Sequence, residues 1–301
     1  MMGKIMTEQA GTIAVSHLGG SEIGYQFGAP YNPDLPTLVM VNSFSTGVDL
    51  YRPQFADERL LQVANLLALE LFGHGQTRAS MKHFTYWDSA IGNLQALEAL
   101  GIEQAFVLGT SQGGWIAVRM AILAPDMIQG IIPLGTSMDY ESQRSRDLGC
   151  WDGIEFCTPS IEALSVEAGD DWVVPTEFVD AVLGAGLGEN VSDEERTFWH
   201  ETHQRNYSGD DGRRRLLIST INLRDRDGLH ARLADVSCPV LWLQGTEDAV
   251  YSVANAQEEI DMFTNSRDAE LRIIDGGQHF LSASDPEVVN TATVDFIERW
   301  K

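Results

Sequence analysis

The chain alternates between short apolar runs and longer stretches with helical spacing. An unbroken apolar run bounded by polar residues is typical of a strand buried on both faces of a parallel sheet. Such runs occupy residues 37–41, 105–108 and 239–243, and similar segments occupy residues 63–69, 130–134 and 271–274. Apolar residues at helical spacing occupy residues 87–100, 114–124, 253–263 and 288–300. This alternation predicts an α/β fold with a mostly parallel central sheet and helices on both faces.

Two segments depart from this alternation. Residues 12–18 and 22–27 are short β-type runs on either side of Gly19-Gly20, which predicts a hairpin ahead of the parallel sheet. Residues 138–235 offer helical segments and loops but no apolar run of the buried-strand type. We therefore expect residues 1–137 and 236–301 to form one core domain, and residues 138–235 to form an inserted, mainly helical lid.

Charge and cysteine content narrow the possible partners and locations. The 301 residues include 44 acidic and 20 basic side chains, a formal charge of -24, so we expect neither nucleic acid nor a membrane as partner. The basic run Arg213-Arg214-Arg215 is flanked by aspartates and indicates a solvated face. Three cysteines make no disulfide framework, and residues 1–8 lack the apolar run of a signal peptide. A cytoplasmic protein is expected, and its oligomeric state, a homodimer included, is left open.

One short motif carries a nucleophile. The sequence Gly109-Thr110-Ser111-Gln112-Gly113 follows the apolar run at 105–108 and precedes a helical segment. Gly-x-Ser-x-Gly alone occurs by chance, but strand, sharp turn and helix are the setting that a nucleophile elbow requires. The glycines permit a strained turn, and the helix N-terminus adds a positive dipole end. We therefore predict Ser111 as the nucleophile.

A serine hydroxyl needs a base to accept its proton and a carboxylate to orient that base. Asp248 follows the run at 239–243 and His279 follows the run at 271–274, so both are predicted at the carboxyl edge of the sheet. The chain order Ser111, Asp248, His279 is the order expected of the fold in which such an elbow occurs. Glu247 and Asp139 remain alternatives for the acid, the latter because it follows the run at 130–134.

Other candidate motifs lack the necessary spacing. The histidines of His200-Glu201-Thr202-His203 stand three apart, not four, so we predict no zinc site there. The glycine-rich residues 184–188 lack the lysine of a phosphate-binding loop. The sequence therefore predicts no metal and no cofactor.

In combination these segments resemble the α/β-hydrolase superfamily. The resemblance runs through residues 66–77, 101–136, 245–251 and 276–280 and leaves out the lid. It implies that residues 70–75, Glu-Leu-Phe-Gly-His-Gly, correspond to a loop that is structural in the family, His74 included. It also implies an oxyanion hole made by the backbone NH groups of Gln112 and Phe44.

One departure from the family pattern bears on the substrate. Asn42-Ser43-Phe44 stands where many members have His-Gly. With Thr46, Asp49 and Pro53-Gln54, this segment is similar to the enol-lactone hydrolases, which points to lactones or activated esters.

The sequence thus predicts a serine hydrolase that cleaves an ester or lactone of a small, mostly apolar molecule through an acyl-enzyme on Ser111. Candidate substrate-binding side chains are Phe44, Trp151, Trp172 and Phe280. An acyltransferase using the same triad and a non-catalytic small-ligand receptor are the alternatives.

Overall fold

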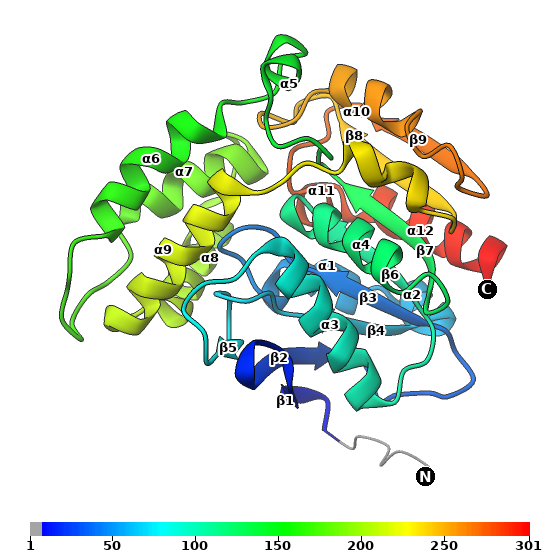
Figure 1. Ribbon diagram of the computed structural model, residues 1–301, viewed down its shortest axis with the longest axis horizontal. Helices are drawn as coiled ribbons and strands as arrows, with labels where there is room; N and C mark the ends of the chain where they lie inside the picture. The colour runs from blue at the N-terminus through cyan, green and yellow to red at the C-terminus, as the bar shows by residue number, and fades with distance from the viewer. Residues whose placement is uncertain (1–7) are drawn as a thin grey trace.

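The computed structural model describes residues 8–301, so residues 1–7, from which the absence of a signal peptide was inferred, lie outside it. One mixed sheet runs through the molecule in the order β1-β2-β4-β3-β6-β7-β8-β9 (Figure 1). Its strands are β1 (Ala10–Val15), β2 (Ser21–Phe27), β3 (Thr37–Val41), β4 (Asn65–Leu69), β6 (Ala105–Thr110), β7 (Ile128–Leu134), β8 (Val240–Gly245) and β9 (Ala269–Ile274), with β5 (Arg78–Ala79) beside β2. All neighbours from β4 to β9 are parallel, and β2 is antiparallel to β1 and β4. The predicted fold class is confirmed.

Helices cover both faces of the sheet (Figure 1). They are α1 (Arg52–Phe55), α2 (Glu58–Val63), α3 (Tyr86–Leu100), α4 (Gln112–Leu123), α10 (Val253–Ile260), α11 (Leu281–Ser284) and α12 (Pro286–Trp300). Side chains of β3 alternate between the two faces: Val39 and Val41 join the apolar cluster that includes α3 and α4, whereas Leu38 and Met40 join the cluster that includes α12. A strand buried on both sides needs apolar residues at every position, which explains the unbroken runs.

Element boundaries differ from the predicted ones by a few residues. The strand expected at 63–69 starts at Asn65, because α2 continues to Val63 after Asp57 caps its N-terminus by accepting from two backbone NH groups. The predicted hairpin forms with Ile13 opposite Ile23, but a 3-10 turn, η1 (His17–Gly19), lengthens its connection. Local capping and turn geometry, which apolar patterning does not encode, account for these shifts.

Five helices separate β7 from β8, and we call residues 138–235 the helical insertion. They are α5 (Gln143–Asp147), α6 (Gly153–Leu164), α7 (Thr176–Leu187), α8 (Asp193–Asn206) and α9 (Gly209–Asp225), followed by η3 (His230–Asp235). In Figure 1, α6 to α9 lie together to one side of the sheet. Insertion side chains such as Val179, Trp199 and Leu223 belong to the same apolar cluster as one face of the sheet. The insertion therefore packs onto the core through a continuous apolar contact.

Within residues 8–301, none of the helices combines the length and the apolarity that a bilayer crossing demands.

Candidate active site

Ser111 occupies a strained turn between β6 and α4. Its backbone has φ 55° and ψ -121°, a conformation that non-glycine residues rarely adopt. The flanking glycines are required by close packing: a Cβ at Gly113 would lie 2.1 Å from the carbonyl oxygen of Val41, and one at Gly109 would lie 2.1 Å from the carbonyl oxygen of Gly113. Thr136 Oγ1 donates to the Ser111 carbonyl oxygen at 2.8 Å and ties the turn to the segment after β7. The turn thus holds the serine side chain at the carboxyl edge of the sheet.

The side chains of Ser111, His279 and Asp248 form one hydrogen-bonded chain. His279 Nε2 lies 2.9 Å from Ser111 Oγ, and His279 Nδ1 lies 3.0 Å from the Asp248 carboxylate. The aspartate can only accept, so Nδ1 carries the proton and Nε2 is left as the acceptor of the serine hydroxyl. All three side chains are buried or nearly so. This arrangement can remove a proton from Ser111 as the hydroxyl attacks an electrophilic carbon.

The Asp248 carboxylate is held by donors from its own loop and strand. Its Oδ1 accepts from the backbone NH groups of Val250 and Tyr251, at 2.8 and 2.9 Å. Its Oδ2 accepts from the Gln244 side-chain amide at 2.8 Å. A buried carboxylate with this many donors keeps a fixed orientation toward His279.

The two alternative acids lie elsewhere. Asp139 accepts from the backbone NH of Tyr140 at 2.8 Å and from the hydroxyl of Ser142, so it organises the turn that leads into α5. Glu247 is exposed to solvent. Within residues 8–301 neither carboxylate makes a hydrogen bond to His279, which pairs with Asp248 instead.

The two backbone amides predicted for the oxyanion hole lie just after neighbouring strands of the sheet. Gln112 is the first residue of α4, and Phe44 lies in the loop after β3, the strand next to β6. Across the described part of the chain, no acceptor is found for the backbone NH of either residue. Both amides therefore remain available to a ligand at this edge.

The Gln112 side chain belongs to a buried network. Its Nε2 lies 3.0 Å from His74 Nε2, and its Oε1 accepts from the Tyr86 hydroxyl at 3.1 Å. Burial lowers the pKa of His74 to about 4, so the ring is neutral at pH 7 and its Nδ1 donates to the Phe72 carbonyl oxygen at 2.9 Å. The ring thus holds Gln112 in place, a structural role as the family resemblance implies.

A cavity of about 30 Å³ opens beside Ser111. The predicted residues Phe44, Trp151 and Phe280 line it beside the catalytic pair Ser111 and His279, and the sequence analysis did not single out the others. The other lining residues are Ser43, Phe156, Val182, Ala185, Gly186, Leu223, Val250 and Tyr251. Among these described residues there is no Lys, Arg, Asp or Glu, so the walls are mostly apolar. The i, i+3, i+4 spacing on α7 was the one available signal for Val182, Ala185 and Gly186.

Trp172 does not line this cavity, so its role as a substrate-binding residue stays a prediction. It precedes α7, whose other end faces Ser111, and its carbonyl oxygen accepts from the backbone NH of Gly209 at 2.8 Å. Its partly buried ring packs against the apolar cluster that the insertion shares with one face of the sheet. The aromatic residues of the insertion indicate that it packs onto the core. They do not indicate which end of each helix faces Ser111.

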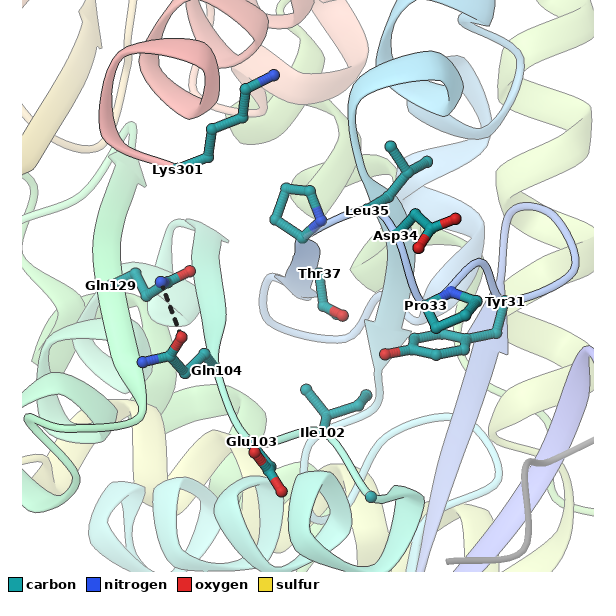
Figure 2. Close-up of a pocket in the computed structure, with 12 residues that line it drawn as sticks. Tyr31, Pro33, Asp34, Leu35, Thr37, Ile102, Glu103, Gln104, Gln129 and Lys301 are labelled. Atoms are coloured by element: carbon teal, nitrogen blue, oxygen red, sulfur yellow. Dashed lines mark hydrogen bonds between the residues drawn. The ribbon is translucent and has the colours of Figure 1, made fainter. Parts of the chain in front are cut away.

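A larger hollow of about 370 Å³ lies at the opposite edge of the sheet (Figure 2). Thr37, at the amino end of β3, lines it together with Asp34, Glu103 and Lys301. Gln129 donates to Gln104 across one wall at 3.2 Å. Ser111 lies at the carboxyl end of the strands, so this hollow is separate from the triad.

The paired histidines of α8 point to different partners. His200 lies 2.9 Å from Asp180, and His203 lies 3.1 Å from Ser45 Oγ. Within residues 8–301, no group of His, Cys, Asp and Glu side chains has the arrangement of a metal site.

Comparison with known proteins agrees with this fold. Residues 36–149 match the family model for the alpha/beta hydrolase fold. A protein from Stutzerimonas stutzeri, provisionally named the carbamate hydrolase RutD, is 22% identical over 275 residues, which cover 91% of this chain and 96% of that protein. A hydrolase from Pseudomonas aeruginosa PA01 superposes with a TM-score of 0.77 at 20% identity over 97% of this chain and 99% of its own. The enol-lactonase from Burkholderia xenovorans LB400 gives 0.75 at 19% identity over 95% and 100%.

The fold, the strained turn at Ser111 and the match to the family model together indicate the class of protein. The chain has the α/β-hydrolase fold, and the comparisons group it with the hydrolases of that fold.

Proposed function

We propose that this protein hydrolyses an ester or lactone of a small, mostly apolar organic molecule through an acyl-enzyme on Ser111. The observation that carries the proposal is the chain of contacts from Ser111 Oγ through His279 to Asp248, at 2.9 and 3.0 Å. These distances are those at which a base can accept a proton directly from a nucleophile.

Acylation follows from this geometry. Ser111 Oγ attacks the acyl carbon, and its proton passes to His279 Nε2, while Asp248 stabilises the imidazolium through Nδ1. The negative charge that develops on the carbonyl oxygen is met by the backbone NH groups of Gln112 and Phe44. When the intermediate collapses, the C–O bond breaks and His279 returns the proton to the leaving alkoxide.

Deacylation repeats the steps with water as the nucleophile. His279 removes a proton from water, hydroxide adds to the acyl carbon, and Ser111 leaves with the returned proton. The acid product is released and the triad is restored. The chain's own residues supply every proton transfer in this sequence.

The cavity walls favour an apolar acyl group. Phe44, Phe156, Val182, Leu223 and Phe280 surround the space beside Ser111. Burying apolar substrate surface against such side chains is favourable, whereas a charged group would lose water without gaining a partner. The charge of -24 further disfavours approach of an anionic substrate.

The helical insertion is proposed to act as a lid. A cavity of about 30 Å³ has room for roughly one or two waters, far less than an ester needs. Contacts close it from the insertion side: the Gly186 carbonyl oxygen accepts from the Phe280 backbone NH at 2.7 Å, and Phe178 packs edge-on against Phe44 at 6.1 Å between centroids. We therefore infer that α7 must move away from residues 279–280 when a substrate enters.

Carbamate hydrolysis is a second candidate, because relatives named as carbamate hydrolases align along most of this chain. The same triad chemistry would attack a carbamate carbonyl. The apolar cavity favours an ester or lactone with an apolar acyl group over a small polar carbamate. Acyl transfer to an alcohol remains an alternative outcome of the same acyl-enzyme.

The proposal extends to partners and location. The buried, unpaired Cys150, Cys157 and Cys238 suit the reducing cytoplasm. The partner is a small-molecule substrate, with neither nucleic acid nor membrane involved.

The proposal is tested by turnover of a matched panel of apolar esters, lactones and carbamates. Wild type is expected to hydrolyse short and medium acyl esters with a burst of alcohol that matches the enzyme concentration, which reports the acyl-enzyme. Ser111→Ala should abolish both burst and turnover, whereas Ser165→Ala, on the surface of the insertion, should retain them. Wild-type turnover with an added alcohol shows whether transfer competes. A wild type inert toward the whole panel would contradict the proposal.

A further inference from the structure

The loop after β3 holds Ser43 rigidly at the catalytic cavity. The Ser43 carbonyl oxygen accepts from Asn42 Nδ2 at 2.9 Å and from Thr46 through both its backbone NH, at 3.2 Å, and its hydroxyl, at 2.9 Å. Asn42 Oδ1 in turn accepts from the backbone NH of Leu71 at 3.1 Å, which ties the loop to the end of β4. Three donors on one carbonyl leave the Ser43 backbone little freedom, so its side chain has a defined position.

A second contact fixes the other side of Phe44. Ser45 has φ 55°, a strained value for serine, and its Oγ lies 3.1 Å from His203 Nε2 on α8. His203 Nδ1 lies 2.8 Å from the Trp199 carbonyl oxygen, so that nitrogen donates and Nε2 accepts from the Ser45 hydroxyl. Ser45 therefore already has a partner, and the helical insertion braces the loop that carries Phe44.

The Ser43 hydroxyl has no such partner. Ser43 is fully buried, and its Oγ finds no hydrogen-bond partner among residues 8–301. Buried hydroxyls in native proteins are nearly always satisfied, so an exception at a cavity wall indicates a group that bonds to ligand. Several other buried polar atoms are also unpartnered, namely Gln54 Oε1, Trp115 Nε1, Arg119 Nε, Tyr207 OH, Arg226 Nε, Thr293 Oγ1 and Trp300 Nε1. Of all these residues in the described chain, Ser43 is the one that lines the cavity with Ser111 and His279.

We propose that the Ser43 hydroxyl is a third oxyanion donor, acting beside the backbone NH groups of Phe44 and Gln112. This inference rests on the proposed function. Ser43 directly precedes Phe44 in a fixed loop and both residues line the cavity beside Ser111, which allows the Ser43 hydroxyl to act together with the next backbone amide. In apolar surroundings a hydroxyl with no competing acceptor gains most when negative charge develops on the substrate oxygen. The hydroxyl keeps its proton throughout, so the covalent steps of acylation are unchanged.

The role predicts a loss confined to the transition state. Ser43→Ala should lower kcat for a reactive ester roughly 10- to 100-fold with KM changed less than about twofold. The affinity for an apolar trifluoromethyl ketone, which adds to Ser111 and bears the same oxyanion, should fall by the same factor. Binding of the corresponding carboxylic acid product should stay unchanged. Thr293→Val, which removes another buried, unpartnered hydroxyl on α12, should leave all these values as in wild type.

Ser43→Cys keeps the side-chain shape with a slightly larger atom and offers only a weak donor, so it guards against a folding defect in Ser43→Ala. Both variants are expected to retain the wild-type urea midpoint. Wild-type kcat and ketone affinity in the two folded variants would overturn the inference while leaving the proposed function intact. A rise in KM alone would also overturn it, since it would make Ser43 a ground-state contact. A wild type that neither turned over esters nor bound the ketone would overturn the proposed function and this inference together.

Discussion

Gln244 donates its side-chain amide to two groups in the loop after its own strand, Asp248 Oδ2 at 2.8 Å and the Tyr251 carbonyl oxygen at 2.7 Å. Because the amide is fully buried at the end of β8, it orients the triad acid from the rigid sheet. Gln244→Leu should lower kcat roughly tenfold, since a misoriented carboxylate misplaces His279.

The same substitution should lower the free energy of unfolding by about 2 kcal/mol, because a buried carboxylate and a carbonyl each lose a donor. Ester turnover and urea unfolding measure the two effects. Gln129→Ala, at the opposite edge of the sheet, is the matched amide control. Unchanged kcat in Gln244→Leu would show that the backbone donors of Val250 and Tyr251 suffice to orient Asp248.

A buried ion pair joins the two ends of the helical insertion. Arg226 and Glu141 are almost fully buried, and Glu141 also accepts from Trp151 Nε1 and the Gly153 backbone NH, both at 2.6 Å. Arg226→Met should lower the free energy of unfolding by about 3–5 kcal/mol, because it leaves the Glu141 charge without its partner. Urea or thermal unfolding measures this effect.

The ion-pair experiment has a surface control and a double variant. Arg232→Ala removes a half-exposed ion pair with Asp235 and should change stability by less than about 1 kcal/mol. The double variant Arg226→Met/Glu141→Gln should recover part of the loss. Equal effects of Arg226→Met and Arg232→Ala would contradict a structural role for the buried pair.

Two buried histidines, His74 and His203, predict that the folded state loses stability in acid. Burial lowers the pKa of both His74 and His203 to about 4, against about 6.5 in an unfolded chain. Between these values the unfolded state binds more protons, so stability is complete above pH 6.5 and is lost as pH falls toward 4, by at most about 3 kcal/mol for each histidine. Urea midpoints measured from pH 7 to pH 4.5 should therefore decline.

His203→Gln separates one of these contributions. Its amide oxygen can still accept from Ser45, but the side chain no longer titrates, so the decline with acid should become shallower than in wild type. Parallel curves for the two proteins would show that His203 does not titrate in this range.

The size of the cavity beside Ser111 should limit the length of the acyl group that the enzyme accepts. Leu223, from α9, lines the small space beside Ser111, and its truncation to alanine removes side-chain volume there. Leu223→Ala should raise the ratio of kcat/KM for octanoyl over acetyl esters roughly three- to tenfold. Leu216→Ala, also buried on α9 but outside the cavity lining, should lower stability without altering this ratio. An unchanged ratio in Leu223→Ala would contradict the proposed acyl pocket.

The sheet and the catalytic residues at its carboxyl edge could be predicted because short stretches of sequence indicate each of them. Most parallel strands are largely apolar, and Ser111, Asp248 and His279 each lie in the turn or loop that follows such a strand, so sheet topology alone brings them to one edge. Strand ends shifted where a neighbouring cap intervened, as at Asp57 before α2.

The rest of the site depends on distant contacts. Ser45 and His203 are separated by 158 positions, and the pairing of Arg226 with Glu141 joins opposite ends of the insertion. No spacing rule relates such residues. Trp172 shows the same limit, because aromatic content in a helical segment does not tell which end faces the core.

The central claim, an activated serine at position 111, is tested most directly by intact-mass spectrometry after incubation with a fluorophosphonate. The contacts of His279 with Ser111 and Asp248 predict a single adduct on the wild type, none on Ser111→Ala and none on His279→Ala under the same conditions. No adduct on the wild type, or an adduct that persists in Ser111→Ala, would contradict the account.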